Sequence, residues 1–210
     1  MKKQNQLYTA LGLLTAFILW TAAISLIDVQ AIGPKGSTVG FSTLNGFVHN
    51  LIGVHFSLYV ITDWLSLIPA CFMLGFALLG LVQWLKRKSL FKVDRGILAL
   101  GGFYLAVLGV YLFFETCVVN YRPVLVDGYL EASYPSSTTL LVLTVMPTAL
   151  MQLRRRIKNS PLRRLVTFAI SAFTVFMVVG RLISGVHWFT DIIGGILFSA
   201  GLVTLYAFMI

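Results

Sequence analysis

The 210-residue sequence has little charge and no long polar stretch. Only 11% of its residues are charged, seven of them acidic, and no run rich in proline or serine is long enough to separate two domains. Hydrophobic residues make up 58% of the chain, with a mean hydropathy of +0.90, which excludes an ordinary soluble globular domain. We therefore expect residues 1–210 to form a single membrane domain.

Cysteine is scarce as well. Cys71 and Cys117 both fall within apolar runs and have no CxxC spacing, which excludes the usual zinc and redox motifs and favours small core residues. His49 and His55 are six residues apart and share no helical face, so we expect them at the membrane interface rather than on a metal, even with Asp63 nearby. The sequence predicts neither a metal nor a cofactor.

Long apolar runs are what the sequence does contain. The stretch Thr43–Val60 has apolar residues at mixed spacing and two histidines, and we expect part of it to lie along the membrane interface. One apolar run is short and contains Pro147, which predicts a kink or a partly re-entrant start. The fold class is therefore all-α, a bundle of six transmembrane helices with an interfacial helix between the first two. A helix crosses a bilayer core in about 20 residues, and six runs suit that length, near 7–27, 61–85, 97–119, 137–153, 165–184 and 189–209.

Positive charge is unevenly divided between the two sides of this topology. Of the 16 Lys and Arg residues, 13 fall near the N-terminus and in the segments 86–95 and 154–164, and only Lys35, Arg122 and Arg181 fall on the other side. Cytoplasmic loops carry the Lys and Arg excess, so we expect both termini in the cytoplasm. The basic run "LRRRIKNSPLRR" is then an inner-leaflet contact rather than a nucleic-acid site.

The N-terminal "MKK" followed by apolar residues also fits a signal peptide, with "VQA" at 29–31 as its cleavage site. The apolar stretch is longer than the ~7–15 residues usual in such peptides. This length favours a first helix that is retained.

Two polar stretches emerge together on the outer side, "NYRPVLVDGYLEASYPSSTT" from Asn120 and "GRLISGVHWFTD" from Gly180. Ionisable groups next to hydrocarbon are costly and usually mark a site. Two guanidinium groups suit phosphate oxygens, and a helix start with serine adds further donors. His187 and Asp191 are four apart, which predicts one helical face; a carboxylate on one imidazole nitrogen leaves the other free to attack.

These stretches resemble the type 2 phosphatidic acid phosphatase (PAP2) family, whose motifs are K-x6-R-P, P-S-G-H and S-R-x5-H-x3-D. The third motif lacks only its leading serine, the second has Thr138 in place of histidine, and the first has Glu115 in place of lysine. Order, spacing and membrane side agree along most of the chain. The matching positions are Arg122-Pro123, Pro135-Ser136-Ser137-Thr138, and Gly180-Arg181 with His187 and Asp191.

The resemblance implies a metal-independent phosphohydrolase that acts on a membrane lipid phosphate or diphosphate, such as a polyprenyl diphosphate or phosphatidate. It implies that His187 attacks phosphorus to form a phosphohistidine and that Asp191 orients it. Bacterial members are similarly short, which implies a multi-pass protein of the plasma membrane with its site on the outer side. The residues implied to bind phosphate are Arg122, Ser136, Ser137 and Arg181.

Thr138 stands where the family has the histidine that protonates the leaving group. A hydroxyl is no proton donor near neutral pH, and losing a positioned general acid costs about 10²–10⁴-fold. A phosphate monoester leaving from a diphosphate needs this proton less than an alkoxide does, because its second pKa is ~6. The substitution predicts a preference for lipid diphosphates.

Glu115 stands where the family has a phosphate-binding lysine, and a carboxylate there repels phosphate. Three alternatives follow: Glu115 pairs with Arg122 or Arg181, it is protonated and replaces the missing acid, or the substrate carries a cation. Lys35 is the one outer lysine that could restore the positive charge. Asp127 and Glu131 read as solvated loop charges at the edge of the site.

Two rival functions stay open. A lipid phosphotransferase would use the same histidine and aspartate but pass the group to an alcohol, and a non-catalytic relative would only bind lipid or a partner protein. A pure binder has no need of an oriented nucleophile, so the set Arg181, His187 and Asp191 favours an enzyme.

Overall fold

The computed structural model describes residues 2–210, and the part of the chain it describes is α-helical, as the sequence predicts. Two short 3-10 turns, Pro34–Gly36 and Leu90–Lys92, lie in the connections. The helices are α1 (Lys2–Leu26), α2 (Ser42–Ile52), α3 (Phe56–Leu65), α4 (Leu67–Arg87), α5 (Arg95–Thr116), α6 (Ser137–Arg156), α7 (Ser160–Ile183) and α8 (Phe189–Met209).

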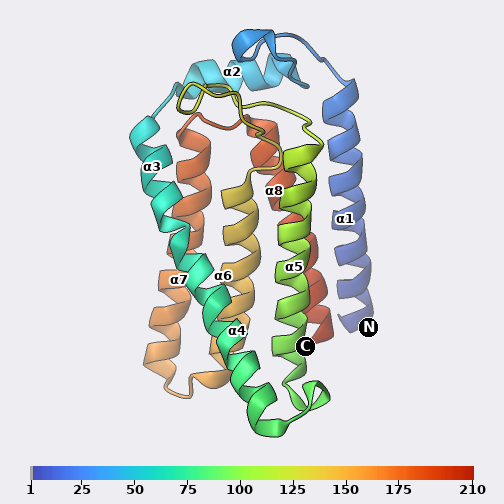
Figure 1. Cartoon of the computed structure of the whole chain (residues 1–210), viewed down its shortest axis with the longest axis vertical. Helices are drawn as coiled ribbons and strands as arrows, with labels where there is room; N and C mark the ends of the chain where they lie inside the picture. Colours follow the sequence, from blue (N-terminus) through green and yellow to red (C-terminus); the bar gives the residue numbers. More distant parts are fainter. Residues whose placement is uncertain (1) are drawn as a thin grey trace.

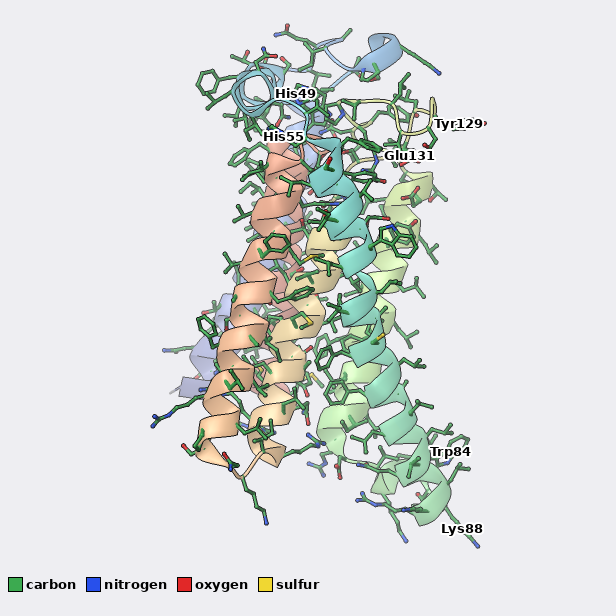
Figure 2. The ribbon with its side chains drawn as sticks, turned by 90° about the vertical axis from the view of Figure 1, so that its left-hand side faces the viewer. His49, His55, Trp84, Lys88, Tyr129 and Glu131 are labelled. Atoms are coloured by element: carbon green, nitrogen blue, oxygen red, sulfur yellow. The ribbon has the colours of Figure 1, made fainter. Side chains whose placement is uncertain are left out.

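The long helices run side by side, and α2 lies across one end of the bundle (Figure 1). Only the first part of the expected interfacial segment, helix α2, therefore lies across the end of the bundle. The rest of that segment belongs to α3, which begins at Phe56. Both termini lie at the end opposite α2 (Figure 1). Figure 2 shows Trp84 and Lys88 at this same end, and His49, His55, Tyr129 and Glu131 at the α2 end.

Within residues 2–210, five segments are long and apolar enough to cross a membrane: α1, α3 with α4, α5, α7 and α8. The predicted sixth span is not found by these criteria, because α6 is not among the five segments. Helix α6 carries Thr144, Thr148 and Gln152, which are buried, and its last turn is basic. It packs on α4, α5, α7 and α8, so its polar side chains face neighbouring helices.

The segment before α6 is held by an aromatic cluster. The ring of Tyr134 stacks on Phe17 of α1 at 6.2 Å, and its hydroxyl lies 2.7 Å from that of Thr21. The same ring covers Gly194 of α8, where a Cβ atom would lie 2.4 Å from it, so only glycine fits. This packing fixes the neighbouring Ser133, which belongs to the site described below.

Cys71 and Cys117 are both free and exposed on the helix bundle, so the prediction that they are small core residues is wrong. Cys71 lies in α4 and Cys117 is the C-cap residue of α5. An apolar run in a membrane protein does not distinguish inward-facing from outward-facing positions.

Candidate active site

His187 lies in the turn between α7 and α8. Gly185 in this turn has a φ of 69°, and a Cβ atom there would lie 2.0 Å from the carbonyl oxygen of Gly53. The carbonyl of Ser184 accepts a hydrogen bond from the backbone N–H of His55 at 2.9 Å. The turn is thereby fixed against the junction of α2 and α3, and His187 is only 4% exposed.

The hydrogen-bond partners of His187 assign its neutral tautomer. Nδ1 lies 3.2 Å from the carbonyl oxygen of Ser133, which only accepts, so Nδ1 carries the proton. Nε2 lies 3.3 Å from Nη1 of Arg122, which only donates, so Nε2 carries the lone pair. The nitrogen that faces the arginine is therefore the nucleophilic one. Burial, together with the charges of Arg122 and Arg181, lowers the pKa of His187 well below its ordinary value of 6.5.

Asp191 is fully buried and lies 3.9 Å from Nδ1 of His187 through Oδ2. The expectation that both share one helical face is wrong in its geometry, because His187 precedes α8 and Asp191 is in its first turn. Asp191 caps the helix, accepting the N–H of Trp188 at 2.9 Å. The spacing of four brings the two together because the turn folds back onto this cap.

Two residues that the sequence did not single out complete this network. Ser133 donates its hydroxyl to Oδ2 of Asp191 at 2.5 Å, and the same hydroxyl oxygen lies 3.1 Å from Nδ1 of His187. Asn120 donates to Oδ1 of Asp191 at 3.3 Å. Ser133 thus bridges the carboxylate and the imidazole. No spacing rule points to it, since it is brought in by the Tyr134 packing.

Arg122 and Arg181 lie at the same end of the bundle, and both are buried. Arg122 forms an ion pair with Glu131, with 3.0 Å between Nε and Oε2. Arg181 pairs with Asp63 of α3 at 3.4 Å, and its guanidinium lies 4.6 Å from the ring centre of Tyr59. Nε of Arg181 is buried and has no hydrogen-bond partner among the described residues.

A polar cavity of about 570 Å³ contains both arginines. A smaller space beside His187 adjoins it, and the two share Tyr111, Glu115, Ala132 and Ser137 in their linings. The lining of the large cavity consists of Asp63, Tyr111, Glu115, Val118, Tyr121, Arg122, Leu130, Glu131, Ala132, Ser137 and Arg181.

The residues of the second motif differ in whether they line the cavity. Ser137 lines both spaces, whereas Ser136 and Thr138 line neither. Ser136 is buried, and its hydroxyl accepts a hydrogen bond from Thr139 at 3.0 Å. Thr138 is 5% exposed and follows Ser137 on α6. Of the two serines predicted to bind phosphate, only Ser137 lines the cavity, because Ser136 is the N-cap residue before α6 and its hydroxyl contacts Thr139 instead.

Glu115 lines both spaces but forms no ion pair with either arginine within the described residues. The interpretation that it pairs with Arg122 or Arg181 is wrong, because Glu131 and Asp63 take those positions. Glu131 lines the cavity, and its side chain is 42% accessible, which agrees with the expected solvated charge at the edge of the site. Lys35, in the turn Pro34–Gly36, is not among the residues that line the cavity.

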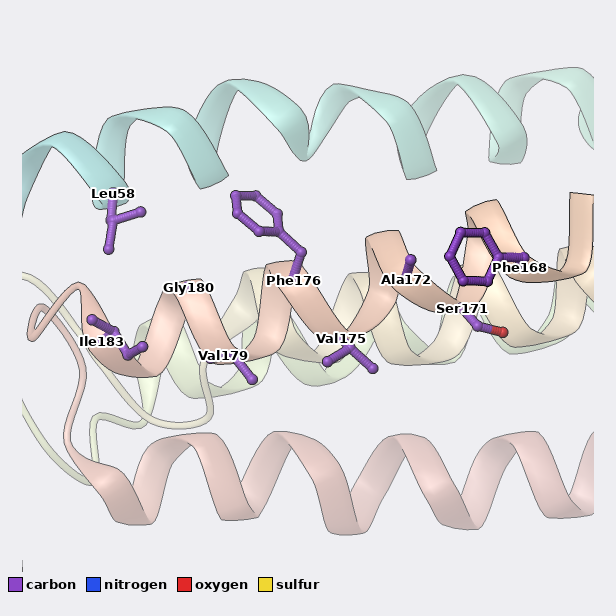
Figure 3. A pocket seen from close by; sticks show the side chains of 9 residues that line it. All are labelled: Leu58, Phe168, Ser171, Ala172, Val175, Phe176, Val179, Gly180 and Ile183. Atoms are coloured by element: carbon purple, nitrogen blue, oxygen red, sulfur yellow. The ribbon is translucent and has the colours of Figure 1, made fainter. Parts of the chain in front are cut away.

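A second hollow of about 610 Å³ runs along α7 and is almost wholly apolar. Figure 3 shows Phe176 directed toward α3, with Val175 and Val179 on the opposite side of α7. Its lining contains no charged residue, so it has nothing to hold a phosphate and resembles a lipid-facing surface.

Comparisons with known proteins agree with this fold. Residues 114–210 match the model of the PAP2 superfamily. The structure is similar to that of a transmembrane PAP2 type phosphatidylglycerolphosphate phosphatase from Bacillus subtilis, with 20% identity, a TM-score of 0.55, and coverage of 96% of this chain and 94% of that one. No curated protein matches the chain. The predicted resemblance is confirmed by the family model over residues 114–210, and the fold of the whole chain is similar to that of a transmembrane PAP2 type protein.

Proposed function

We propose that this PAP2-superfamily protein hydrolyses a lipid phosphate or diphosphate through a phosphohistidine on His187. One observation carries the proposal: the lone pair of Nε2 faces a buried arginine, while the proton on Nδ1 is held by the carbonyl of Ser133. A neutral imidazole so fixed is ready to attack phosphorus without first losing a proton.

In the first step Nε2 bonds to phosphorus and the bond from phosphorus to the lipid-side oxygen breaks, the electron pair leaving with that oxygen. Arg122 and Arg181 take phosphoryl oxygens in exchange for the carboxylates that they now contact. The phosphorylated ring is positive, and Asp191 stabilises it through Ser133. Water then attacks phosphorus, which releases inorganic phosphate and restores Nε2.

We further propose six spans, with α6 as the sixth, and a site at the outer face. Support comes from the 13 basic residues near the N-terminus and in the two segments that lie away from α2. Helix α6 has 20 residues, which suits a bilayer core, and its neighbours cover its polar residues.

The first prediction concerns the leaving group. Thr138 does not line the cavity, so it supplies no proton to a departing oxygen. A polyprenyl diphosphate should therefore have a kcat about 10²-fold or more above that of phosphatidate, the loss expected without a general acid. Phosphate release from both lipids in detergent measures this, with the His187→Ala variant as background. Faster release from phosphatidate contradicts the prediction.

The second prediction concerns pH. Only the neutral ring attacks, so the lowered pKa of His187 should keep kcat/KM level as pH falls through 6.5, with the decline at lower pH. The unfolded chain binds that proton more readily, so the free energy of unfolding also falls below pH 6.5. The pH dependence of kcat/KM is measured with a lipid phosphate and with a lipid diphosphate. A decline at low pH that both substrates share belongs to the enzyme, because the two substrates ionise differently. A shared limb centred at or above 6.5 contradicts the assignment.

A further inference from the structure

The two steps of the proposed mechanism make opposite demands on protons. In the first, a phosphate monoester that leaves from a diphosphate needs little help from an acid, because its second pKa is ~6. In the second, water attacks phosphorus and must lose a proton, and a positioned general base speeds such a step by about 10²–10⁴-fold. The site therefore needs a base more than it needs an acid.

The position of this base follows from the direction of attack. Water enters in line, on the side of phosphorus opposite Nε2 of His187, as the bond to that nitrogen breaks. Nε2 faces Arg122, which lines the large cavity, so water approaches from that cavity. The space beside His187 has a volume of only about 10 Å³, room for about one water molecule, and does not hold the lipid. The base must therefore border the large cavity and lie next to the nucleophile.

Three carboxylates line the large cavity, Asp63, Glu115 and Glu131. Asp63 and Glu131 form ion pairs with the two arginines, and neither lines the space beside His187. Glu115 lines both spaces, and within residues 2–210 it pairs with neither arginine. Of the three, Glu115 is the carboxylate that borders both the nucleophile and the path of the water.

The exposure of Glu115 suits a base. It lies in the last turn of α5 and is open to solvent. An exposed carboxylate is ionised at neutral pH, so it is ready to accept a proton, and solvent takes that proton away afterwards. Tyr111 and Ser137 also line both spaces, and their hydroxyls can hydrogen-bond the water but are not bases near neutral pH.

We propose that Glu115 is the general base of the second step. The proposal rests on the proposed function and adds a catalytic residue to it. The oxygen of water bonds to phosphorus, the bond from phosphorus to Nε2 of His187 breaks, and its electron pair returns to the ring. The carboxylate of Glu115 takes the proton of the water. Inorganic phosphate leaves, and Glu115 gives the proton to solvent.

The Glu115→Gln variant separates the two steps, because glutamine has nearly the same shape but takes up no proton. The detergent-solubilised full chain is mixed with a polyprenyl diphosphate labelled in its terminal phosphate and quenched in alkali at short times. Unlabelled substrate is then added to follow the loss of label. The rate constant for loss of phosphohistidine should fall about 10²- to 10⁴-fold, while that for its formation changes little.

Steady-state kinetics give a second readout of the same variant. Labelled protein should accumulate during turnover of Glu115→Gln, so kcat and KM should fall together. Their ratio should stay the same, because kcat/KM depends only on the steps up to release of the lipid product. An unchanged rate of phosphohistidine formation also shows that the variant is folded.

Formate tests the base by replacing it. In Glu115→Ala the carboxylate is missing, and added formate should raise the rate constant for loss of phosphohistidine by about tenfold or more. Equal rate constants with and without formate contradict the proposal. The control is Asp127→Asn, since Asp127 is exposed outside the cavity and asparagine tolerates its φ of 49°. This variant should keep both rate constants within about threefold.

Failure of this proposal and failure of the proposed function give different results. If Glu115→Gln slows formation and loss of phosphohistidine equally, or slows neither, the base is overturned and the proposed function stands. If the unaltered protein releases phosphate but carries no label on His187 at any time, the proposed function itself is overturned.

Discussion

Replacing His187 by alanine should abolish phosphate release, with kcat reduced about 10⁴- to 10⁶-fold, the range observed when a covalent nucleophile is removed. The structure gives the reason: Nε2 of His187 faces Arg122 and the cavity, and no other histidine lines either space. Phosphate release from a lipid diphosphate in detergent, at saturating substrate, measures the loss.

The matched control is His55→Ala. His55 lies at the same end of the bundle and is exposed, and its ring hydrogen-bonds to the carbonyl of Ile52. This variant should keep kcat within about threefold of the unaltered protein, as a surface substitution does. Equal losses in both variants would mean that the site is elsewhere or that any change at this end unfolds the protein.

Replacing Asp191 by asparagine should reduce kcat about 10²- to 10⁴-fold, as when the carboxylate that orients a catalytic histidine is lost. Its Oδ2 accepts hydrogen bonds from Ser133 and from the backbone of Trp188. The amide nitrogen of asparagine in that place is itself a donor and cannot accept the hydroxyl of Ser133 or the N–H of Trp188. Ser133 then no longer holds the imidazole. In the proposed mechanism the substrate phosphate contacts Arg122 and Arg181 rather than Asp191, so KM should change little.

A purely structural role for Asp191 would lower the amount of folded protein without this separation of kcat from KM. The control is Ser199→Ala, also in α8, which removes a buried hydroxyl that donates to the carbonyl of Leu140 at 3.1 Å, away from His187. Thermal unfolding of both variants accompanies the kinetics. A kcat for Asp191→Asn equal to that of the control would refute the orienting role.

The helices could be predicted from the sequence because apolar runs of fixed length leave few alternatives in a membrane. The last span is predicted at 189–209, and α8 is Phe189–Met209. Hydropathy is continuous across the break at Ser66 between α3 and α4, so it does not reveal the break. Pro69 is the local signal, because it has no N–H to donate to the carbonyl of Leu65. The burial of α6 could not be predicted from the sequence, because polar residues in a membrane helix are unfavourable unless neighbouring helices cover them, and the sequence does not show those neighbours.

The site was predictable where spacing along the chain reflects spacing in the fold. Arg122, Arg181, His187 and Asp191 gather at one end because their loops share that end of the bundle. Ser133 and the pairing of Glu131 with Arg122 depend on how the loop 120–136 folds back, which its sequence does not specify. The exclusion of Ser136 from the cavity depends on the geometry of the start of α6, which the four consecutive hydroxyl residues from Ser136 to Thr139 leave undetermined.

Trapping the enzyme-bound phosphoryl group addresses the nucleophile itself. Brief incubation with a lipid diphosphate labelled in its terminal phosphate, followed by an alkaline quench and peptide mapping, should find acid-labile phosphate on Nε2 of His187 and none in His187→Ala. Label on another residue, or phosphate release at full rate with no labelled histidine, would contradict the proposal that this imidazole attacks phosphorus.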